Sequence, residues 1–444
     1  MRLGLGIRLG PIGGFAMPSG LSWDSSYPVT VQRSGTGYTV VEQPRSYIPP
    51  EVFSGTTFYV DIATGSDADS GLTEALAKKC IYLAIAAGNA TGAPFQVMVK
   101  GGSYNRDFNF NASGGGTVPT QHCAVIGYGG RVITGSYSET HTWAADATFT
   151  NTYSATRSAC TRLFDRLNLD AFGNYAELTQ VADAATCNTT PGSWAQVGSI
   201  VYARRLDGAP VTHANTRTLL TGEACLLGTK TIYLEGIDFE GGNIVGCMNA
   251  TQTATRNIVA VGCTFKYAGS ATTPSNDGVA VNNMTGLAAF FNCEADANSK
   301  DGFNSHANTG THNFLTVNCR GEDNGRYAST SCNGFTVHEA TSAIDVGGYY
   351  GGNRNGSDFH NINTSKCWAI GTEVVQSAAG YASNLANACF TVGDTAIIWA
   401  ENTRATAQSG ARALQAVNGT IRKRNHTTVA GAEVATGTGA IDSF

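Results

Sequence analysis

The feature that most constrains this chain is a short phrase repeated between Thr231 and Asn363. Each copy has an apolar run of β-forming residues, then a small or amide residue, then a second short run that ends in Gly or Asn. The turning residues are Gly236, Gly262, Asn292, Asn318 and Gly347, which are 26, 30, 26 and 29 residues apart. A period in this range, built from β-branched and aromatic residues, predicts a parallel β-solenoid of stacked coils.

Composition agrees with this all-β prediction. The 444 residues include 54 Gly, and only 14% are charged. Stacked coils explain this, since inward positions take Val, Ile, Phe, Ala and Cys, outward positions take Ser, Thr and Asn, and Gly or Asn occupies left-handed corners. A net charge of −5 gives no reason to expect nucleic acid as a partner. No apolar run approaches the ~18 residues of a membrane span, so none is expected.

Three of the twelve cysteines, Cys263, Cys293 and Cys319, directly follow turning residues of consecutive coils. They are therefore expected to stack in one interior column. Parallel Cβ vectors are poorly aimed for disulfide bonds, which favours buried reduced thiols, with oxidation in a finished extracellular particle as the alternative. No Cys/His spacing typical of a structural zinc site occurs.

Residues 1–55 differ from the rest of the chain. Apolar residues alternate with glycine or arginine at positions 3–10, and six prolines between 11 and 50 exclude a continuous helix. We interpret this segment as a docking peptide followed by a linker. Because Arg8 and several glycines interrupt its apolar positions, no cleaved export signal is expected.

Residues 56–400 are predicted to form the solenoid. A strand at 58–62, a short helix near 76–87 and a strand at 95–100 open it, and the helix is expected to cap the exposed strand edges. The rhythm breaks at about 141–220, which we interpret as a lateral insertion. After Ala400 the repeat fades into Thr-rich sequence, so residues 401–444 are predicted to be a C-terminal cap or oligomerisation tail.

Several motifs carry a resemblance to a known family. YVDIATGSDADSG, AIAAG, VMVKGGSY and AVIGYGGRVITG resemble the opening of right-handed parallel β-helix proteins of the pectate-lyase-like superfamily. PGSWAQVGSIVYARRLDGAP, residues 191–210, resembles a segment found in such proteins, especially in tailed-phage appendages. This resemblance implies a right-handed parallel β-helix and, by analogy with tailspikes, a homotrimer.

Four phrases, DGVAVN, DGFNSH, NGFTVH and GSDFH, contain candidate binding residues. Aligning their glycines 278, 302, 334 and 356 places Asn282, His306, His338 and His360 in one column, and Asn304 and Asp358 in a second. With the neighbouring acids Asp301 and Glu339 and loop arginines 320, 326 and 354, this face is a candidate for glycan binding through hydrogen bonds and carboxylates. A polar ladder that only stabilises the sheet is the alternative.

No metal and no cofactor is expected at this column, because ligands lined up along one sheet rarely enclose a tetrahedral ion. Asp67 and Asp69 are candidates for calcium, although Asx-turn hydrogen bonding is favoured. The sequence contains no nucleophile elbow, phosphate loop or HExxH motif.

The favoured function is a tailspike-like or fibre-like phage appendage. It would dock on other virion proteins through residues 1–55 and contact host surface polysaccharide, and its location would be the virion, assembled in host cytoplasm. The alternative is a polysaccharide lyase or glycoside hydrolase on the same fold, with acids from Asp301, Asp358 and Glu339 and a cation from Lys300 or Arg354. A secreted bacterial enzyme is a third, less favoured interpretation.

Overall fold

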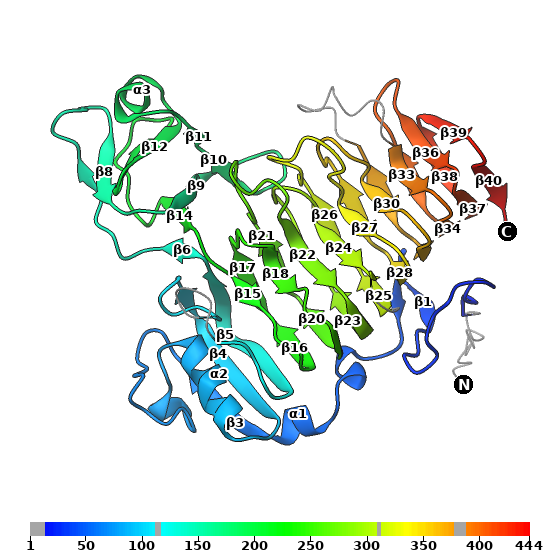
Figure 1. Cartoon of the computed structure of the whole chain (residues 1–444), viewed down its shortest axis with the longest axis horizontal. Coiled ribbons are helices and arrows are strands. Elements are labelled where there is room, and N and C mark those ends of the chain that lie inside the picture. The colour runs from blue at the N-terminus through cyan, green and yellow to red at the C-terminus, as the bar shows by residue number, and fades with distance from the viewer. Residues whose placement is uncertain (1–13, 112–116, 309–311, 377–387) are drawn as a thin grey trace, which may run out of the picture.

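The computed structural model describes residues 14–111, 117–308, 312–376 and 388–444. The chain winds into a parallel β-solenoid of about 12 turns (Figure 1). Successive coils pair strand to strand in parallel register, as in Phe303 with Phe335 and Phe335 with Phe359. The predicted fold class is therefore confirmed.

Three sheets run along the solenoid in its described part. The first sheet consists of β15 (Cys225–Leu226), β18 (Gly246–Ala250), β22 (Asp277–Asn282), β24 (Phe303–His306), β27 (Phe335–Val337), β30 (Phe359–Asn361), β33 (Ala388–Gly393), β36 (Arg412–Val417) and β39 (Ala432–Thr436). A smaller sheet consists of β26 (Arg320–Glu322), β29 (Tyr349–Gly351), β32 (Glu373–Val375), β35 (Arg404–Thr406) and β38 (Thr427–Ala430).

The largest sheet opens with β3 (Thr56–Val60), β4 (Phe95–Tyr104) and β5 (Cys123–Gly135). It continues with β16 (Ile232–Glu235), β17 (Ile237–Glu240), β20 (Ile258–Val261), β21 (Thr264–Lys266), β23 (Met284–Phe291), β25 (His312–Val317), β28 (Ser342–Val346), β31 (Lys366–Ile370), β34 (Ile397–Glu401), β37 (Thr420–Arg424) and β40 (Ala440–Ser443), while β19 (Ala254–Thr255) pairs with β23.

The turning residues form a column of left-handed corners. All five predicted residues have positive φ, from 51° at Asn292 to 66° at Gly236. Gly and Asn are the residues that adopt this conformation at least cost. The column continues at Gly371, Asn402 and Asn425, with φ of 68°, 51° and 53°. The prediction that the repeat ends at Ala400 is therefore wrong, because β35 to β40 extend all three sheets through residues 401–444.

A ladder of buried asparagines supports a second corner. Asn298, Asn324 and Asn353 stack one coil apart, and each side-chain amide donates to the next member, Asn353 to Asp358. All four side chains are almost completely buried. The ladder pairs polar groups that the turns would otherwise leave unsatisfied in the interior.

The cysteine column lies in the interior as expected. Cys263, Cys293 and Cys319 are buried, and the Cys293 and Cys319 thiols donate to backbone carbonyls of the preceding coil, at 3.5 and 3.3 Å. All twelve cysteines are free. Burial raises the pKa of the Cys263 and Cys293 thiols well above its ordinary value, so the structure contains inert reduced thiols.

Helix α2 (Ile81–Ala90) covers the first coil, as the sequence predicts, although it begins five residues later. The short 3-10 helix η2 (Glu74–Leu76) occupies the expected start. Asp67 accepts hydrogen bonds from the backbone of Lys79 and Cys80, at 3.1 and 2.9 Å, and so fixes the chain just before α2. This carboxylate holds a loop in place through contacts 12 and 13 residues away, rather than through the local Asx turn that the sequence favours.

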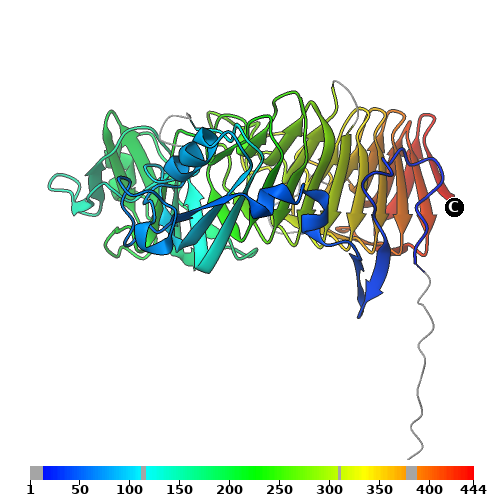
Figure 2. The same ribbon diagram turned by 90° about the horizontal axis from the view of Figure 1, so that it is seen from below.

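Residues 14–55 form a belt on the outer face of the largest sheet (Figure 2). It contains the hairpin β1 (Val31–Ser34) and β2 (Gly37–Val40), the 3-10 helix η1 (Pro44–Tyr47) and α1 (Glu51–Ser54). Its apolar side chains pack on outward residues such as Trp368 and Phe291. Interpreting this part as a linker is therefore wrong, while residues 1–13 lie outside the described residues.

The lateral insertion is a subdomain of mostly antiparallel strands, residues 137–220. One of its sheets contains β6 (Tyr137–Ser138), β9 (Cys160–Leu169), β10 (Tyr175–Glu177) and β14 (Thr216–Leu220). The other contains β7 (Ala144–Ala145), β8 (Tyr153–Thr156), β11 (Thr179–Gln180), β12 (Ser193–Val197) and β13 (Ile200–Arg204), with α3 (Ala184–Thr189) beside it. No helix in the described part of the chain is long and apolar enough to cross a bilayer.

Candidate functional site

The predicted histidine column is present only in part. Asn282 pairs with His306 in the sheet register, and the rings of His306 and His338 stack with their centroids 3.9 Å apart. His360 instead pairs with Thr336. Aligning Gly356 with Gly334 is therefore wrong by two residues.

The aromatic core sets this register. Phe335 and Phe359 stack inside the solenoid with centroids 4.3 Å apart and ring planes within 11°. This stacking places Asp358 beside Gly334, whose backbone N–H donates to the Asp358 carbonyl at 2.9 Å. The spacing of the glycines in the sequence does not indicate this contact.

Three other candidate residues are buried. Asn304, Asp301 and Asp358 are 3%, 1% and 1% exposed, so a glycan cannot reach them. Asn304 donates to Asp277 at 2.8 Å, the Asp301 carboxylate accepts from the Asn333 backbone N–H at 2.7 Å, and the Asp358 carboxylate accepts from Asn353 at 2.9 and 3.1 Å. These groups stabilise the corner between coils.

Burial also determines how these acids titrate. It raises the pKa of Asp301 to about 8, and the adjacent Asp277 carboxyl reinforces the shift. Burial likewise raises the pKa of Asp358 to about 7. A perturbed pKa can mark a catalytic acid, but these carboxyls face the interior rather than a cleft, so they do not form a catalytic pair.

His306, His338 and Glu339 do come together at the surface. Glu339 adopts a left-handed φ of 47°, and its carboxylate oxygens lie 3.2 and 3.3 Å from the Nδ1 of His306. One of these oxygens also accepts from the Ala307 backbone N–H at 3.1 Å. Of the seven predicted site residues, all of which the structure describes, only these three form an accessible cluster.

A groove lies elsewhere, between the subdomain and the solenoid corner that follows β26 and β29. Its volume is about 860 Å³. The subdomain wall includes Asp170, Glu177, Thr179 and Gln180, and the solenoid wall includes Arg326, Tyr327 and Arg354. We call this feature the subdomain groove. A volume of this size falls within the range of ligand-binding clefts.

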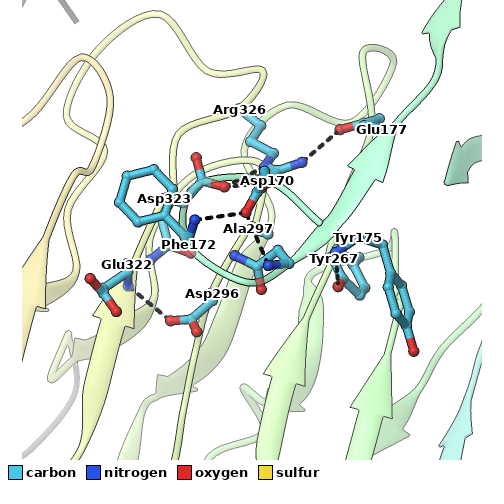
Figure 3. Close-up of polar contacts among 12 residues, drawn as sticks. Asp170, Phe172, Tyr175, Glu177, Tyr267, Asp296, Ala297, Glu322, Asp323 and Arg326 are labelled. Carbon is cyan, nitrogen blue, oxygen red and sulfur yellow. Dashed lines mark hydrogen bonds and ion pairs between the residues drawn. The ribbon is translucent and has the colours of Figure 1, made fainter. Parts of the chain in front are cut away.

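A network of ion pairs connects the two walls (Figure 3). Arg326 lies 2.5 Å from Asp170 and 3.3 Å from Glu177, and it also pairs with Asp323 of its own loop. From the subdomain side, Arg162 donates to both oxygens of Glu177, at 2.8 and 2.7 Å. Such bidentate, largely buried pairs fix orientation as well as charge.

The network shifts the pKa values of the two groove carboxyls, Glu177 and Asp170, in opposite directions. Burial alone would raise the pKa of Glu177, but the Arg162 guanidinium, with help from Arg326 and Tyr327, lowers it to about 2. Burial raises the pKa of Asp170, and the Arg326 guanidinium offsets only part of that rise. Glu177 is therefore a permanent carboxylate, whereas Asp170 holds its proton to a higher pH.

Local structure positions each member. The Asp170 carboxylate accepts from the backbone of Phe172 and Asn174, at 2.9 and 3.0 Å, which closes the turn between β9 and β10 (Figure 3). Glu177 ends β10. Arg326 lies two residues after the ladder residue Asn324, so the ladder fixes where the guanidinium leaves the corner.

Arg326 and Arg354 are predicted loop arginines, whereas Asp170 and Glu177, the subdomain acids that flank Arg326, are not predicted from the sequence. The missing partners lie about 150 residues earlier, in a region without coil rhythm. A usable signal was the clustering of arginines on consecutive corners, since a largely buried arginine requires a carboxylate partner. Nothing local marked Asp170 or Glu177 as those partners.

The charged groups of the subdomain groove are paired with one another, so the groove offers a ligand mainly hydrogen-bonding groups. Glu177 has every oxygen engaged by Arg162, Arg326 or Tyr327, and Arg354 donates to Asp323 at 2.9 Å. The exposed lining on the subdomain side is instead neutral and polar, with the Thr179 hydroxyl and the Gln180 amide.

No family model and no curated protein sequence matches the chain. Among solved structures, XylC in complex with xylose is 10% identical with a TM-score of 0.47, over 84% of this chain and 69% of that one. Pectate lyase Pel9A is 12% identical with a TM-score of 0.35, over 83% and 82%. The tailspike protein gp49 from Pseudomonas phage LKA1 is 11% identical with a TM-score of 0.29, over 82% and 71%.

These similarities concern architecture. The chain is a parallel β-solenoid by its own strand pairing, and a pectate lyase and a tailspike occur among its structural neighbours. The parallel β-solenoid that the resemblance implies is confirmed by the strand pairing of the chain itself. Because one fold carries many functions, the activity has to be argued from the site.

Proposed function

We propose that the chain binds a polysaccharide in the subdomain groove. The observation that carries this proposal is that two walls distant in sequence are fixed relative to each other by the buried network of Arg162, Glu177 and Arg326. A groove fixed in this way is formed before the ligand arrives, so binding does not have to order it.

The chemistry of the walls suits a glycan. Thr179 and Gln180 are exposed and supply hydroxyl and amide groups, Tyr327 supplies an aromatic ring, and Arg354 is partly exposed with 37% of its side chain accessible. Hydroxyl-rich sugars require such donors and acceptors beside an apolar surface. The other charges are paired within the network, so the proposed ligand is recognised mainly by hydrogen bonds.

Cleavage is a second candidate, favoured by one observation. Asp170 and Glu177 flank the same guanidinium, and their pKa values move in opposite directions. Paired carboxyls of unequal acidity are the pattern that glycoside hydrolases use. In this proposal Asp170 donates its proton to the glycosidic oxygen as the bond from that oxygen to the sugar carbon breaks. Water then bonds to the sugar carbon and returns a proton to Asp170, while Glu177 stays paired with its arginines and stabilises the positive charge on the sugar.

The appendage role remains a proposal. It comprises a virion location, a homotrimer, docking through residues 1–55, and host surface polysaccharide as the ligand. The support is the sequence resemblance of residues 191–210 to tailed-phage appendages. The native mass of the full chain tests the trimer, and a stable monomer would contradict it.

The binding test is a panel of soluble bacterial surface polysaccharides, measured by titration calorimetry and affinity electrophoresis. We expect the double variant Thr179→Ala/Gln180→Ala to lose binding, while Gln252→Ala, exposed outside the groove, keeps it. Binding that survives the double variant would contradict this site. For cleavage, Asp170→Asn should retain binding and lose the release of reducing ends, and a wild-type chain that binds without releasing them rejects hydrolysis.

A further inference from the structure

Two histidines and a glutamate cluster at the C-terminal ends of strands β24 and β27 of the first sheet. His306 ends β24, His338 follows β27 in the next coil, and Glu339 begins the turn after it. We propose that His306, His338 and Glu339 bind one divalent transition-metal ion of the borderline class to which Zn²⁺ belongs. This inference is independent of the subdomain groove.

The turn supplies the donor that the sheet alone could not. The stacked rings of His306 and His338 lie 3.9 Å apart and within 17° of parallel, which by itself leaves two ligands in a row. Glu339, with its φ of 47°, brings its carboxylate back over His306. The objection that ligands along one sheet do not enclose an ion is therefore met by a third ligand outside the strands.

The donor atoms are already close. One donor atom from each residue lies within 4.8 Å of the other two. The 3.2 Å between the His306 Nδ1 and the Glu339 carboxylate is near the separation of two ligands on a tetrahedral ion, about 3.3 Å. An ion lies in the plane of each imidazole it binds, so the rings have to turn out of their stack to share it.

A further observation indicates a missing partner. The Nε2 of His338 is buried and has no hydrogen-bond partner among the described residues. A buried ring nitrogen without a partner is rare, and a metal ion or its bound water would satisfy it. The His306 and Glu339 side chains remain 24% and 29% exposed, which provides an entry path.

The ligand set indicates which ions fit. Two imidazoles and one carboxylate suit zinc, cobalt, nickel or copper, whereas calcium and magnesium require oxygen-rich sites. The backbone N–H of Ala307, which donates to the Glu339 carboxylate, would orient it as an outer partner. Three protein ligands leave a coordination position for water or a ligand oxygen.

The test uses the full chain, freed of metal with a chelator and titrated with Zn²⁺ by calorimetry and with Co²⁺ by visible absorbance. We expect one ion per chain. His306→Ala and His338→Ala should each abolish saturable binding, and Glu339→Gln should weaken it. His360→Ala is the matched control, a histidine of the same sheet outside the cluster, and should bind like wild type.

Absence of saturable binding by the wild-type chain would overturn the proposal. So would binding that persists in the double variant His306→Ala/His338→Ala, or that disappears equally in His360→Ala. A measurement free of variants guards against misfolding: electron spin-echo spectroscopy of the Cu²⁺-loaded wild type should count two coordinated imidazoles. A count of none or one would also overturn the proposal.

Discussion

The Nδ2 of Asn324 donates to the Oδ1 of Asn353 across 2.9 Å, and both amides are fully enclosed by neighbouring coils. Each ladder residue satisfies the turn of the adjacent coil as well as its own. Asn324 accepts from the backbone and the side chain of Asn298, at 3.1 and 2.9 Å, and donates to the Ala295 carbonyl. The ladder therefore ties successive coils together by side-chain hydrogen bonds, in addition to the pairing of their strands.

Removing the middle of the ladder should destabilise the solenoid. Asn324→Ala leaves buried groups of Asn298 and Asn353 without partners, and each such group costs about 1–3 kcal/mol. We expect the free energy of unfolding to fall by about 3 kcal/mol, measured by denaturant titration. Gln252→Ala, an exposed substitution, should change it by less than about 0.5 kcal/mol. Equal effects of the two variants would contradict the role of the ladder.

The buried carboxyl of Asp301 predicts a pH dependence of stability. Its folded pKa, about 8, exceeds the ordinary value of 3.8, so the folded state keeps the proton longer than the unfolded state. The stability it contributes is complete below pH 3.8 and is lost as pH rises towards 8. Asp301→Asn keeps an acceptor for Asn333 and cannot ionise, so its stability should fall less over this range.

We expect Asp301→Asn to be more stable than wild type at pH 8 by about 2 kcal/mol, from chemical denaturation at several pH values. Asp183→Asn is the control, because that exposed acid has a lowered pKa owing to the Thr186 backbone N–H. Asp183→Asn should leave the pH dependence of the free energy of unfolding unchanged between pH 3.8 and 8. A wild-type slope retained in Asp301→Asn would refute the assignment.

The Arg162 side chain is completely buried between the subdomain and the solenoid. It pairs with Glu177 and donates to the carbonyls of Ala268 and Ala297, at 3.4 and 3.2 Å. Arg162→Met should therefore cost about 3–5 kcal/mol and raise hydrogen exchange across residues 137–220, because a buried carboxylate loses its main partner. Arg404→Met, which removes an exposed pair, should cost less than about 1 kcal/mol.

Substituting Gly371 and Gly262 compares two losses of folding stability. Both substitutions strain a left-handed corner, but only the one at Gly371 also disturbs the belt. A Cβ at Gly371 would lie 2.0 Å from the Tyr38 ring, whereas a Cβ at Gly262 would meet nothing within 4 Å, although both residues have positive φ. Gly262→Ala should cost about 1 kcal/mol. Gly371→Ala should cost more and should expose residues 14–55 to limited proteolysis, and equal protease sensitivity of the two variants would contradict this contact.

The coil periodicity could be predicted because it is local. An apolar run and a corner residue mark each coil wherever it lies, and the same pattern at Asn402 and Asn425 marks the final coils in residues 401–444, which are predicted to be a tail. Runs such as IVAV and CWAI are apolar at every position rather than at alternate ones. Continuous apolar strands indicate burial on both faces, and the belt covers the second face.

The site was harder to predict because its parts are distant in sequence. The positions of His306 and His338 follow from strand register, and Glu339 lies in the turn that follows. The predicted outward positions of Asp301 and Asp358 are wrong, because the corner turns enclose both side chains. The subdomain groove depends on Arg326 meeting Asp170 and Glu177 from an insertion. Charge pairing across such a separation leaves no periodic trace in one sequence.

The belt is fastened to several coils along the length of the solenoid. Gly20 and Ser22 contact Lys366, Asp24 contacts Asn313, Tyr27 and Tyr47 contact Asn257, and Arg45 pairs with Glu235. The belt is thus fastened at both ends of this stretch of coils, and its hairpin doubles back so that Tyr38 reaches Gly371. A bare solenoid could gain or lose a coil without disturbing the others, but a strap fastened at fixed points ties the number of coils between Glu235 and Lys366 to the length of residues 20–45.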